Sequence, residues 1–222
     1  MELNTHHLIT PKTARYSTYG KMSAKTKYFW FVLHGSNMLA EQMLYKFKEF
    51  DLETHFVVAP EGLSRFYLNG FGGDVVSSWM TKRDRLEEIH DFSVYCSTLF
   101  DLHVQKIPAT CKTIIMGFSQ GGITAMRWLH HIEVSVDFLI PYASWIPEDI
   151  DYGIAKTNWD QICKIFTYGE QDQFLNEKRI NEIKEICERG NLDFNIEAYP
   201  GDHRVDKKQL KKIFKQYIEQ KK

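Results

Sequence analysis

The stretch Lys112–Gly122, KTIIMGFSQGG, decides the fold that we predict for this chain of 222 residues. It opens with an apolar, β-branched run from Lys112 to Met116, turns within Gly-Phe-Ser-Gln-Gly-Gly, and continues into a helical pattern from Gln120. A buried strand that passes directly into a helix is typical of βα units in a mostly parallel sheet.

The same alternation of short apolar runs and longer helical patterns extends along the chain from about residue 28. Several runs are continuously apolar, as expected for parallel strands that are covered on both faces. The predicted core strands are Tyr28–Leu33, Thr54–Val58, Lys112–Met116, Asp137–Ile140, Ile165–Tyr168 and Phe194–Tyr199. The predicted fold class is therefore α/β, with a mostly parallel central sheet and helices on both faces.

Helical spacing is clearest in a stretch that Thr81 is expected to cap. Its apolar stripe consists of Leu86, Ile89, Phe92, Cys96 and Leu99. Further helices are predicted after Gln120, from about Glu177 to Arg189 with Gly190 as the stop, and from about Asp206. The last helix has a lysine-rich face, which we interpret as solvated rather than lipid-bound.

Length and composition favour a single α/β domain over residues 1–222, since 43% of the side chains are hydrophobic and no linker divides the chain. Residues 1–20, with Leu8, Ile9 and Pro11 ahead of a run near Tyr16, are expected to form a β-hairpin at the sheet edge.

Charge and cysteine usage limit the partners and the compartment. Basic and acidic residues nearly cancel, 28 against 29, which disfavours nucleic acid as a partner. The N-terminus lacks a secretory pattern and no apolar run approaches the ~20 residues of a membrane span, so stable membrane insertion is not expected. Four scattered cysteines without metal-ligand spacing indicate free thiols and no metal site, in a cytoplasmic protein that is a monomer or a homodimer.

Ser119 is the candidate nucleophile. It stands at the centre of Gly117-Phe118-Ser119-Gln120-Gly121, between a buried strand and a helix. Such a sharp turn needs residues without side chains two before and two after the serine, because the backbone passes close to itself. The turn also sets the serine at the positive end of a helix, where a developing oxyanion is stabilised.

A serine nucleophile requires a base and an acid, which in α/β-hydrolases follow it in the order Asp, then His. Asp172, in the loop after the predicted strand Ile165–Tyr168, is the predicted acid, with Glu170 and Asp160 as alternatives. His203, in the loop after Phe194–Tyr199, is the predicted base. It is the one histidine among nine that follows the acid loop.

Backbone N–H groups of Ser36 and Gln120 are the predicted oxyanion donors, because the loop after Tyr28–Leu33 is expected beside the serine turn. His34 is interpreted as a structural residue beneath that loop. The glycine-rich, aromatic stretch from Glu61 to Trp79 has the character of a functional loop without regular structure. Its aromatic residues and one further tryptophan are the predicted lining of an acyl groove: Phe66, Tyr67, Phe71, Trp79 and Trp145.

These motifs resemble the phospholipase/carboxylesterase family of α/β-hydrolases, which includes the acyl-protein thioesterases. The matching segments, in the family's order, are Leu33-His34-Gly35, Ala59-Pro60, Ser78-Trp79, Gly117-Phe118-Ser119-Gln120-Gly121-Gly122, Gly169-Glu170-Gln171-Asp172 and Gly201-Asp202-His203. The resemblance implies an α/β-hydrolase core, a Ser119–Asp172–His203 triad, oxyanion donors at Ser36 and Gln120, and no cofactor. It implies an ester or thioester as the small-molecule substrate.

Three departures from the family pattern bear on the substrate. Ser36-Asn37-Met38 stands where a Gly-Asp pair is usual, Gly201-Asp202-His203 where Gly-Gly-His is usual, and Met80-Thr81-Lys82-Arg83 follows Trp79 in place of an aromatic residue and an aspartate. The triad survives these changes, whereas thioesterase specificity does not transfer, so carboxylesterase is the preferred assignment. A catalytically silent hydrolase fold, and a peptidase or lipase on this scaffold, are the alternatives.

Overall fold

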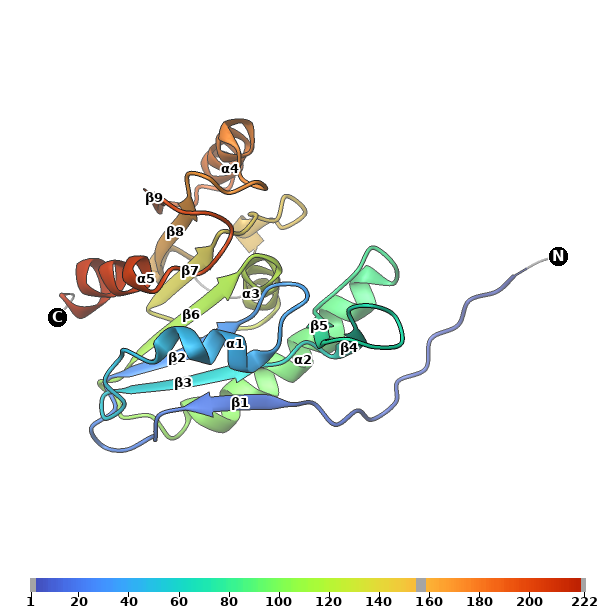
Figure 1. The fold of residues 1–222 in the computed structure, drawn as a ribbon, viewed down its shortest axis with the longest axis horizontal. Coiled ribbons are helices and arrows are strands. Elements are labelled where there is room, and N and C mark those ends of the chain that lie inside the picture. The colour runs from blue at the N-terminus through green and yellow to red at the C-terminus, as the bar shows by residue number, and fades with distance from the viewer. Residues whose placement is uncertain (1–2, 155–158, 221–222) are drawn as a thin grey trace.

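The computed structural model describes residues 3–154 and 159–220, which contain one large sheet. Seven strands lie in the order β1-β3-β2-β6-β7-β8-β9, and only β1 runs antiparallel to its neighbour (Figure 1). Their bounds are β1 Tyr16–Tyr19, β2 Tyr28–Leu33, β3 His55–Pro60, β6 Lys112–Phe118, β7 Phe138–Tyr142, β8 Cys163–Gly169 and β9 Phe194–Tyr199. The mostly parallel sheet predicted from the apolar runs is confirmed.

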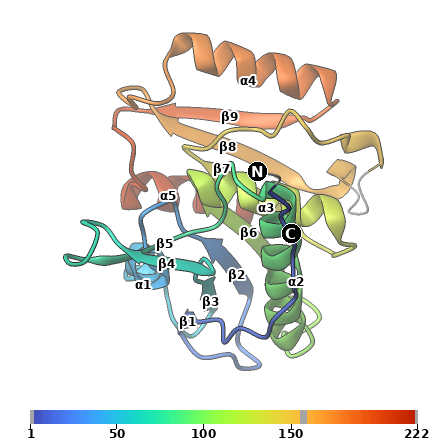
Figure 2. The same ribbon diagram turned by 90° about the vertical axis from the view of Figure 1, so that its right-hand side faces the viewer.

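Helices cover both faces of this sheet, as predicted. Figure 2 shows α2 and α3 on one side of it and α1 and α5 on the other. The helices are α1 Ala40–Leu44, α2 Arg85–Val104, α3 Gln120–His131, α4 Glu177–Arg189 and α5 Lys207–Ile213, which continues as a π-helical turn, Phe214–Glu219. Short 3₁₀ turns lie at Tyr45–Phe47, Tyr152–Ile154 and Trp159–Gln161. Among the described residues, no helix is both long enough and apolar enough to cross a membrane.

Strand β2 illustrates why its sequence is apolar throughout. Successive side chains of a strand point to opposite faces. Trp30 therefore packs against Phe47 on one face, with ring centroids 5.0 Å apart, while Phe31 packs against Trp128 of α3 on the other, also at 5.0 Å. Both side chains are fully buried, so a polar residue at either position would face the core.

Three predictions of local structure were wrong. Residues 3–15 contain no strand, so the expected N-terminal hairpin reduces to β1, which pairs with β3. The stretch from Glu61 to Trp79 is not irregular, because β4 (Ser64–Tyr67) and β5 (Val75–Ser78) form an antiparallel hairpin within it. Thr81 does not cap α2, whose N-cap residue is Asp84; Thr81 instead contacts the Glu88 carboxylate.

Candidate active site

Ser119 occupies a strained turn between β6 and α3. Its backbone lies at φ 51° and ψ −120°, in a region that non-glycine residues adopt at a cost of ~1–3 kcal/mol. The flanking glycines are required sterically. A Cβ on Gly117 would collide with the Gly121 carbonyl, and one on Gly121 would lie 2.5 Å from the carbonyl oxygen of His34.

Hydrogen bonds hold this turn at both of its backbone polar groups. The Ser119 amide donates to the Tyr142 carbonyl of β7 at 2.9 Å. The Ser119 carbonyl accepts from the Gly122 amide at 3.0 Å and from the Ser144 hydroxyl at 2.7 Å. Ser144 is a residue that sequence reasoning missed, since a single serine after a strand carries no distinguishing pattern.

The side chains of Ser119, His203 and Asp172 form a continuous chain of hydrogen bonds. His203 Nε2 lies 3.0 Å from Ser119 Oγ, and His203 Nδ1 lies 2.6 Å from Asp172 Oδ2. A carboxylate can only accept, so Nδ1 carries the proton and Nε2 is free to accept the serine proton. This is the arrangement that general-base activation of a serine requires.

Asp172 is fixed more firmly than the other carboxylates considered as the acid. Its side chain is fully buried, and its second oxygen accepts from the Phe174 amide at 2.8 Å. Glu170 and Asp160 are both exposed, and Asp172 is the one that contacts His203. The geometry therefore favours Asp172 over the two alternatives.

The acid and base loops are joined by backbone contacts at the ends of β8 and β9. The Glu170 amide donates to the Tyr199 carbonyl at 2.9 Å, and the Gln171 amide donates to the Gly201 carbonyl at 2.8 Å. The loops approach so closely that a Cβ on Gly169 would collide with Gly201. Asp172 and His203, 31 positions apart in sequence, are thus held in register by main chain.

Two phenylalanine rings enclose the His203 imidazole. Phe118 lies 5.0 Å from it and Phe174 lies 4.7 Å from it, centroid to centroid. Phe118 is buried in the core, whereas Phe174 is 59% exposed. Phe174 was not predicted. Its position two residues after the acid gives it a second function as the amide donor to Asp172.

The loop that was predicted to supply an oxyanion donor lies against the serine turn. The close approach of Gly121 to the His34 carbonyl brings the start of α3 next to residues 34–36. His34 itself is fully buried, accepts from the Gly62 amide through Nε2 at 2.9 Å, and lies with Nδ1 2.7 Å from the Gly35 carbonyl. Burial lowers the pKa of His34 to about 4, so the ring is neutral and serves as a support for this loop rather than as a second base.

The side chain of Gln120 joins the serine turn to the end of β5. Its Oε1 accepts from the Trp79 amide at 3.0 Å and from the Ser78 hydroxyl at 3.1 Å, and its Nε2 donates to the Met80 carbonyl at 2.8 Å. The predicted oxyanion role of Gln120 involves its backbone alone, so the side chain is free for this link.

The serine hydrolase (FSH1) family matches the chain over residues 35–213, a range that contains Ser119, Asp172 and His203. The chain belongs to this family of serine hydrolases. The resemblance that the sequence motifs predicted is confirmed, and the fold is that of the α/β-hydrolases. No curated protein matches the chain in sequence.

Solved structures share the fold of this serine hydrolase at low sequence identity. Acyl-protein thioesterase 2 from Zea mays superposes with a TM-score of 0.70 at 16% identity, covering 91% of this chain and 97% of that one. A phospholipase/carboxylesterase from Dyadobacter fermentans gives 0.66 at 18% identity, with 94% and 98% covered. The carboxylesterase of Bacillus cereus gives 0.64 at 13% identity, with 92% and 93% covered.

A cleft of about 410 Å³ lies along α3 of this serine hydrolase; its lining includes Ile123, four residues after Ser119, but none of Ser119, Asp172 and His203. It is lined by Met80, Thr81, Lys82, Arg85, Ile123, Arg127, Trp145, Pro147, Glu148 and Asp149. Of the aromatic residues predicted to line an acyl groove, Trp145 lies in this cleft, whereas Phe66 and Trp79 do not.

The predicted groove residues outside the cleft have other environments. Trp79 is buried, donates through Nε1 to the His34 carbonyl at 2.9 Å and packs on the His34 ring, so it supports the loop of residues 34–36. Phe66, on the projecting β4–β5 hairpin, is 43% exposed, and Phe71 is fully exposed.

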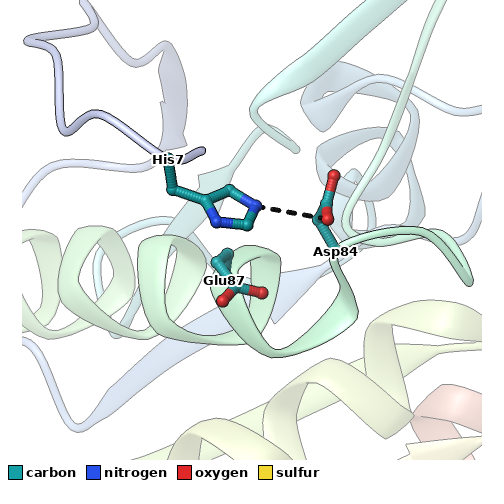
Figure 3. A group of neighbouring side chains, drawn as sticks. All are labelled: His7, Asp84 and Glu87. Atoms are coloured by element: carbon teal, nitrogen blue, oxygen red, sulfur yellow. Dashed lines mark hydrogen bonds and ion pairs between the residues drawn. The ribbon is translucent and has the colours of Figure 1, made fainter. Parts of the chain in front are cut away.

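A separate cluster of His7, Asp84 and Glu87 lies at the first turn of α2 (Figure 3). His7 Nε2 is 3.2 Å from Asp84 Oδ1, and the three ligand atoms lie within 4.8 Å of one another. All three residues are exposed, and the positive end of the helix opposes a bound cation. We therefore interpret the cluster as a contact that places the N-terminal segment against α2.

Proposed function

We propose that this serine hydrolase cleaves carboxylic esters through an acyl-enzyme intermediate, with Ser119, His203 and Asp172 as its catalytic triad. The observation that carries the proposal is the position of His203, whose two ring nitrogens lie 3.0 Å from the serine oxygen and 2.6 Å from the aspartate oxygen. These are distances for proton transfer and for orientation of the base.

The reaction begins with attack of Ser119 Oγ on the carbonyl carbon while His203 Nε2 takes the hydroxyl proton. Backbone N–H groups of Ser36 and Gln120 stabilise the oxyanion, an interaction worth ~3–4 kcal/mol per donor in comparable sites. His203 returns the proton to the departing alkoxide. A water molecule, deprotonated by the same nitrogen, then attacks the acyl carbon; the bond from this carbon to Ser119 Oγ breaks, His203 returns the proton to Ser119 Oγ, and the acid is released.

The test is turnover of p-nitrophenyl esters from acetate to palmitate by the purified chain and by the Ser119→Ala variant. Ester hydrolysis that the variant loses, together with fluorophosphonate labelling of Ser119 in the parent, is the expected result. The chain length with the highest kcat/KM measures the acyl site. Well-folded protein that neither hydrolyses any ester nor takes the label would favour a catalytically silent hydrolase fold.

Oxygen esters are preferred over thioesters as the substrate class because the chain departs from the thioesterase pattern after His34-Gly35 and after Trp79. A matched pair of acylcholine and acylthiocholine substrates, which differ only in the oxygen or sulfur of the leaving group, separates the two. A ratio of kcat/KM that favours the thioester would reverse this preference while leaving the triad assignment intact. Peptide p-nitroanilides in the same assay test the peptidase alternative.

A further inference from the structure

The cleft along α3 changes character along its length. Close to the serine turn its walls are apolar or aromatic: Met80 is bonded through its carbonyl to the Gln120 side chain, and Trp145 directly follows Ser144, which holds the Ser119 carbonyl. Its other wall residues include Lys82, Arg85 and Arg127, which are cationic, and Glu148 and Asp149, which are acidic. The cleft residues that adjoin the serine turn are therefore apolar or aromatic, and the charged residues come from other parts of its wall.

Helix α3 sets the direction from the nucleophile to the cations. Ser119, Ile123 and Arg127 are spaced by four residues, so they lie on one face of the helix. At 1.5 Å per residue the Arg127 backbone lies roughly 12 Å along the axis from Ser119. Long side chains on a helix lean back toward its N-terminus, which brings the guanidinium nearer to the serine than the backbone is.

Positive charge in this part of the cleft exceeds the acidic groups that balance it. Arg127 Nη2 contacts one oxygen of Asp149 at 2.5 Å, and Arg85 pairs with the other oxygen of the same carboxylate. One carboxylate thus serves two guanidinium groups. Lys82 adds a third cation, and Glu148 is exposed at the rim.

Arg127 is unusual among arginines because it is almost fully buried, with 7% relative exposure, and pairs only through Nη2 with Asp149 among the described residues. Its Nε and Nη1 atoms are buried without a hydrogen-bond partner among the described residues. Burial also lowers the pKa of Arg127, although arginine stays charged at neutral pH. A buried guanidinium that is only partly paired is stabilised by the charge of an anion brought into the cleft, because the interaction between charges is stronger where water is excluded.

The acidic residues at the start of α2 do not offset this charge. Asp84 contacts His7 and Glu87 lies beside this pair, as Figure 3 shows, and Asp84 Oδ2 also lies 3.9 Å from Arg83 Nε. Neither of them lines the cleft. A further cation, Arg179, stacks on the Trp145 ring with its guanidinium carbon 5.2 Å from the centroid.

We propose that the cleft selects esters whose acyl chain ends in a carboxylate, with the methylene groups against Met80, Ile123 and Trp145 and the terminal anion at Arg85, Arg127 and Lys82. This substrate class rests on the proposed esterase function. The anion shares the two guanidinium groups with Asp149, and an incoming carboxylate gains charge-assisted hydrogen bonds that a neutral chain end does not.

The experiment compares mono-p-nitrophenyl esters of glutaric, adipic and suberic acid with the corresponding terminal amides, which match them in length and shape. The expected ratio of kcat/KM, acid over amide, is roughly tenfold for the chain length that fits, as one charge-assisted contact would give. Raising the salt concentration to about 0.5 M should lower that ratio, because exposed parts of the ion pairs are screened.

Charge-neutralising variants test the residues. Arg85→Gln and Lys82→Gln should each lower the acid-to-amide ratio by roughly threefold to tenfold. Asp149→Asn should raise it, because it releases both guanidinium groups. Arg83→Gln is the matched control, since Arg83 is 90% exposed and does not line the cleft.

An acid-to-amide ratio near or below one in the parent overturns the proposal. So does a ratio that Arg85→Gln and Lys82→Gln leave unchanged. In each of these cases, Ser119-dependent cleavage of the p-nitrophenyl ester bond in the terminal-amide substrates would show that the protein is an esterase without this selectivity. Absence of hydrolysis of every ester would remove the esterase function itself.

Discussion

Replacing Asp172 with asparagine tests the proposed catalytic chain at its least exposed member. The asparagine carbonyl can still accept from the Phe174 amide, which now bonds to Asp172 Oδ1 at 2.8 Å. Its NH₂ group then faces His203 Nδ1 in place of the oxygen at 2.6 Å. Because an NH₂ group donates, Nδ1 must become the acceptor, and the imidazole proton moves to Nε2, which faces Ser119.

The wrong tautomer prevents His203 from accepting the serine proton, so the expected loss in kcat is about 10⁴-fold, or about 5.4 kcal/mol in the activation barrier. Stopped assays with the best p-nitrophenyl ester, using enzyme checked by its melting curve, measure it. Glu170→Gln is the matched control because this nearby carboxylate is exposed. If kcat falls by less than tenfold in Asp172→Asn while Glu170→Gln is as active as the parent, Asp172 is not the acid.

Three further predictions follow from packing and burial. Gly121→Ala should lower the free energy of unfolding by about 3 kcal/mol and kcat/KM by at least ~10²-fold, because the new Cβ would lie 2.5 Å from the His34 carbonyl oxygen and closer still to that of Leu33. Urea titration measures the first effect and ester turnover the second. Values equal to those of the parent would contradict this close contact. The pKa of His34 is lowered from 6.5 to about 4, so the free energy of unfolding should be unaffected by this group above about pH 6.5 and should fall by about 3 kcal/mol as the pH drops toward 4. Urea titrations of the parent and of His34→Gln should therefore give free energies of unfolding that change with pH at different slopes between pH 6.5 and 4. Equal slopes would contradict this prediction. His7→Ala should change the free energy of unfolding by less than ~1 kcal/mol, because the His7 and Asp84 side chains are both about half exposed. A larger loss in the same urea titration would show that the N-terminal segment contributes more to stability than this contact indicates.

The parallel strands were predictable because burial on both faces leaves a direct record in the sequence. Strand β2 has the predicted bounds, Tyr28–Leu33, and five of its six residues are buried. The β4–β5 hairpin left no such record: all four residues of β4 are exposed, so neither an apolar run nor an alternating pattern marks it. Apolar residues also misled at Leu8 and Ile9, which are 90% and 93% exposed and pair with no strand.

The residues of the candidate site likewise differ in how far the sequence could predict them. Ser119 was predictable because its strained turn demands glycines at fixed spacing, and His203 because of its order in the chain. Asp172 needed the structure to separate it from Glu170 and Asp160, since the choice depends on which carboxylate reaches Nδ1. Aromatic content alone did not distinguish Trp145, which lines the cleft, from buried Trp79, because side-chain type does not reveal which way a ring points.

The cationic part of the cleft has no signature in sequence at all, because Arg85, Arg127 and Asp149 come from three separate segments. Their association depends on α3, which also carries Ser119 at its N-cap. The glycines at its start allow Ser119 to lie close to β6 and to the loop of residues 34–36, whereas Ile123 and Arg127 lie one and two turns further on. The proposed catalysis and the proposed substrate selection thus involve different turns of one helix. Substitutions at the second and third turns should therefore alter which esters are cleaved while leaving the hydrogen-bonded chain at Ser119 in place.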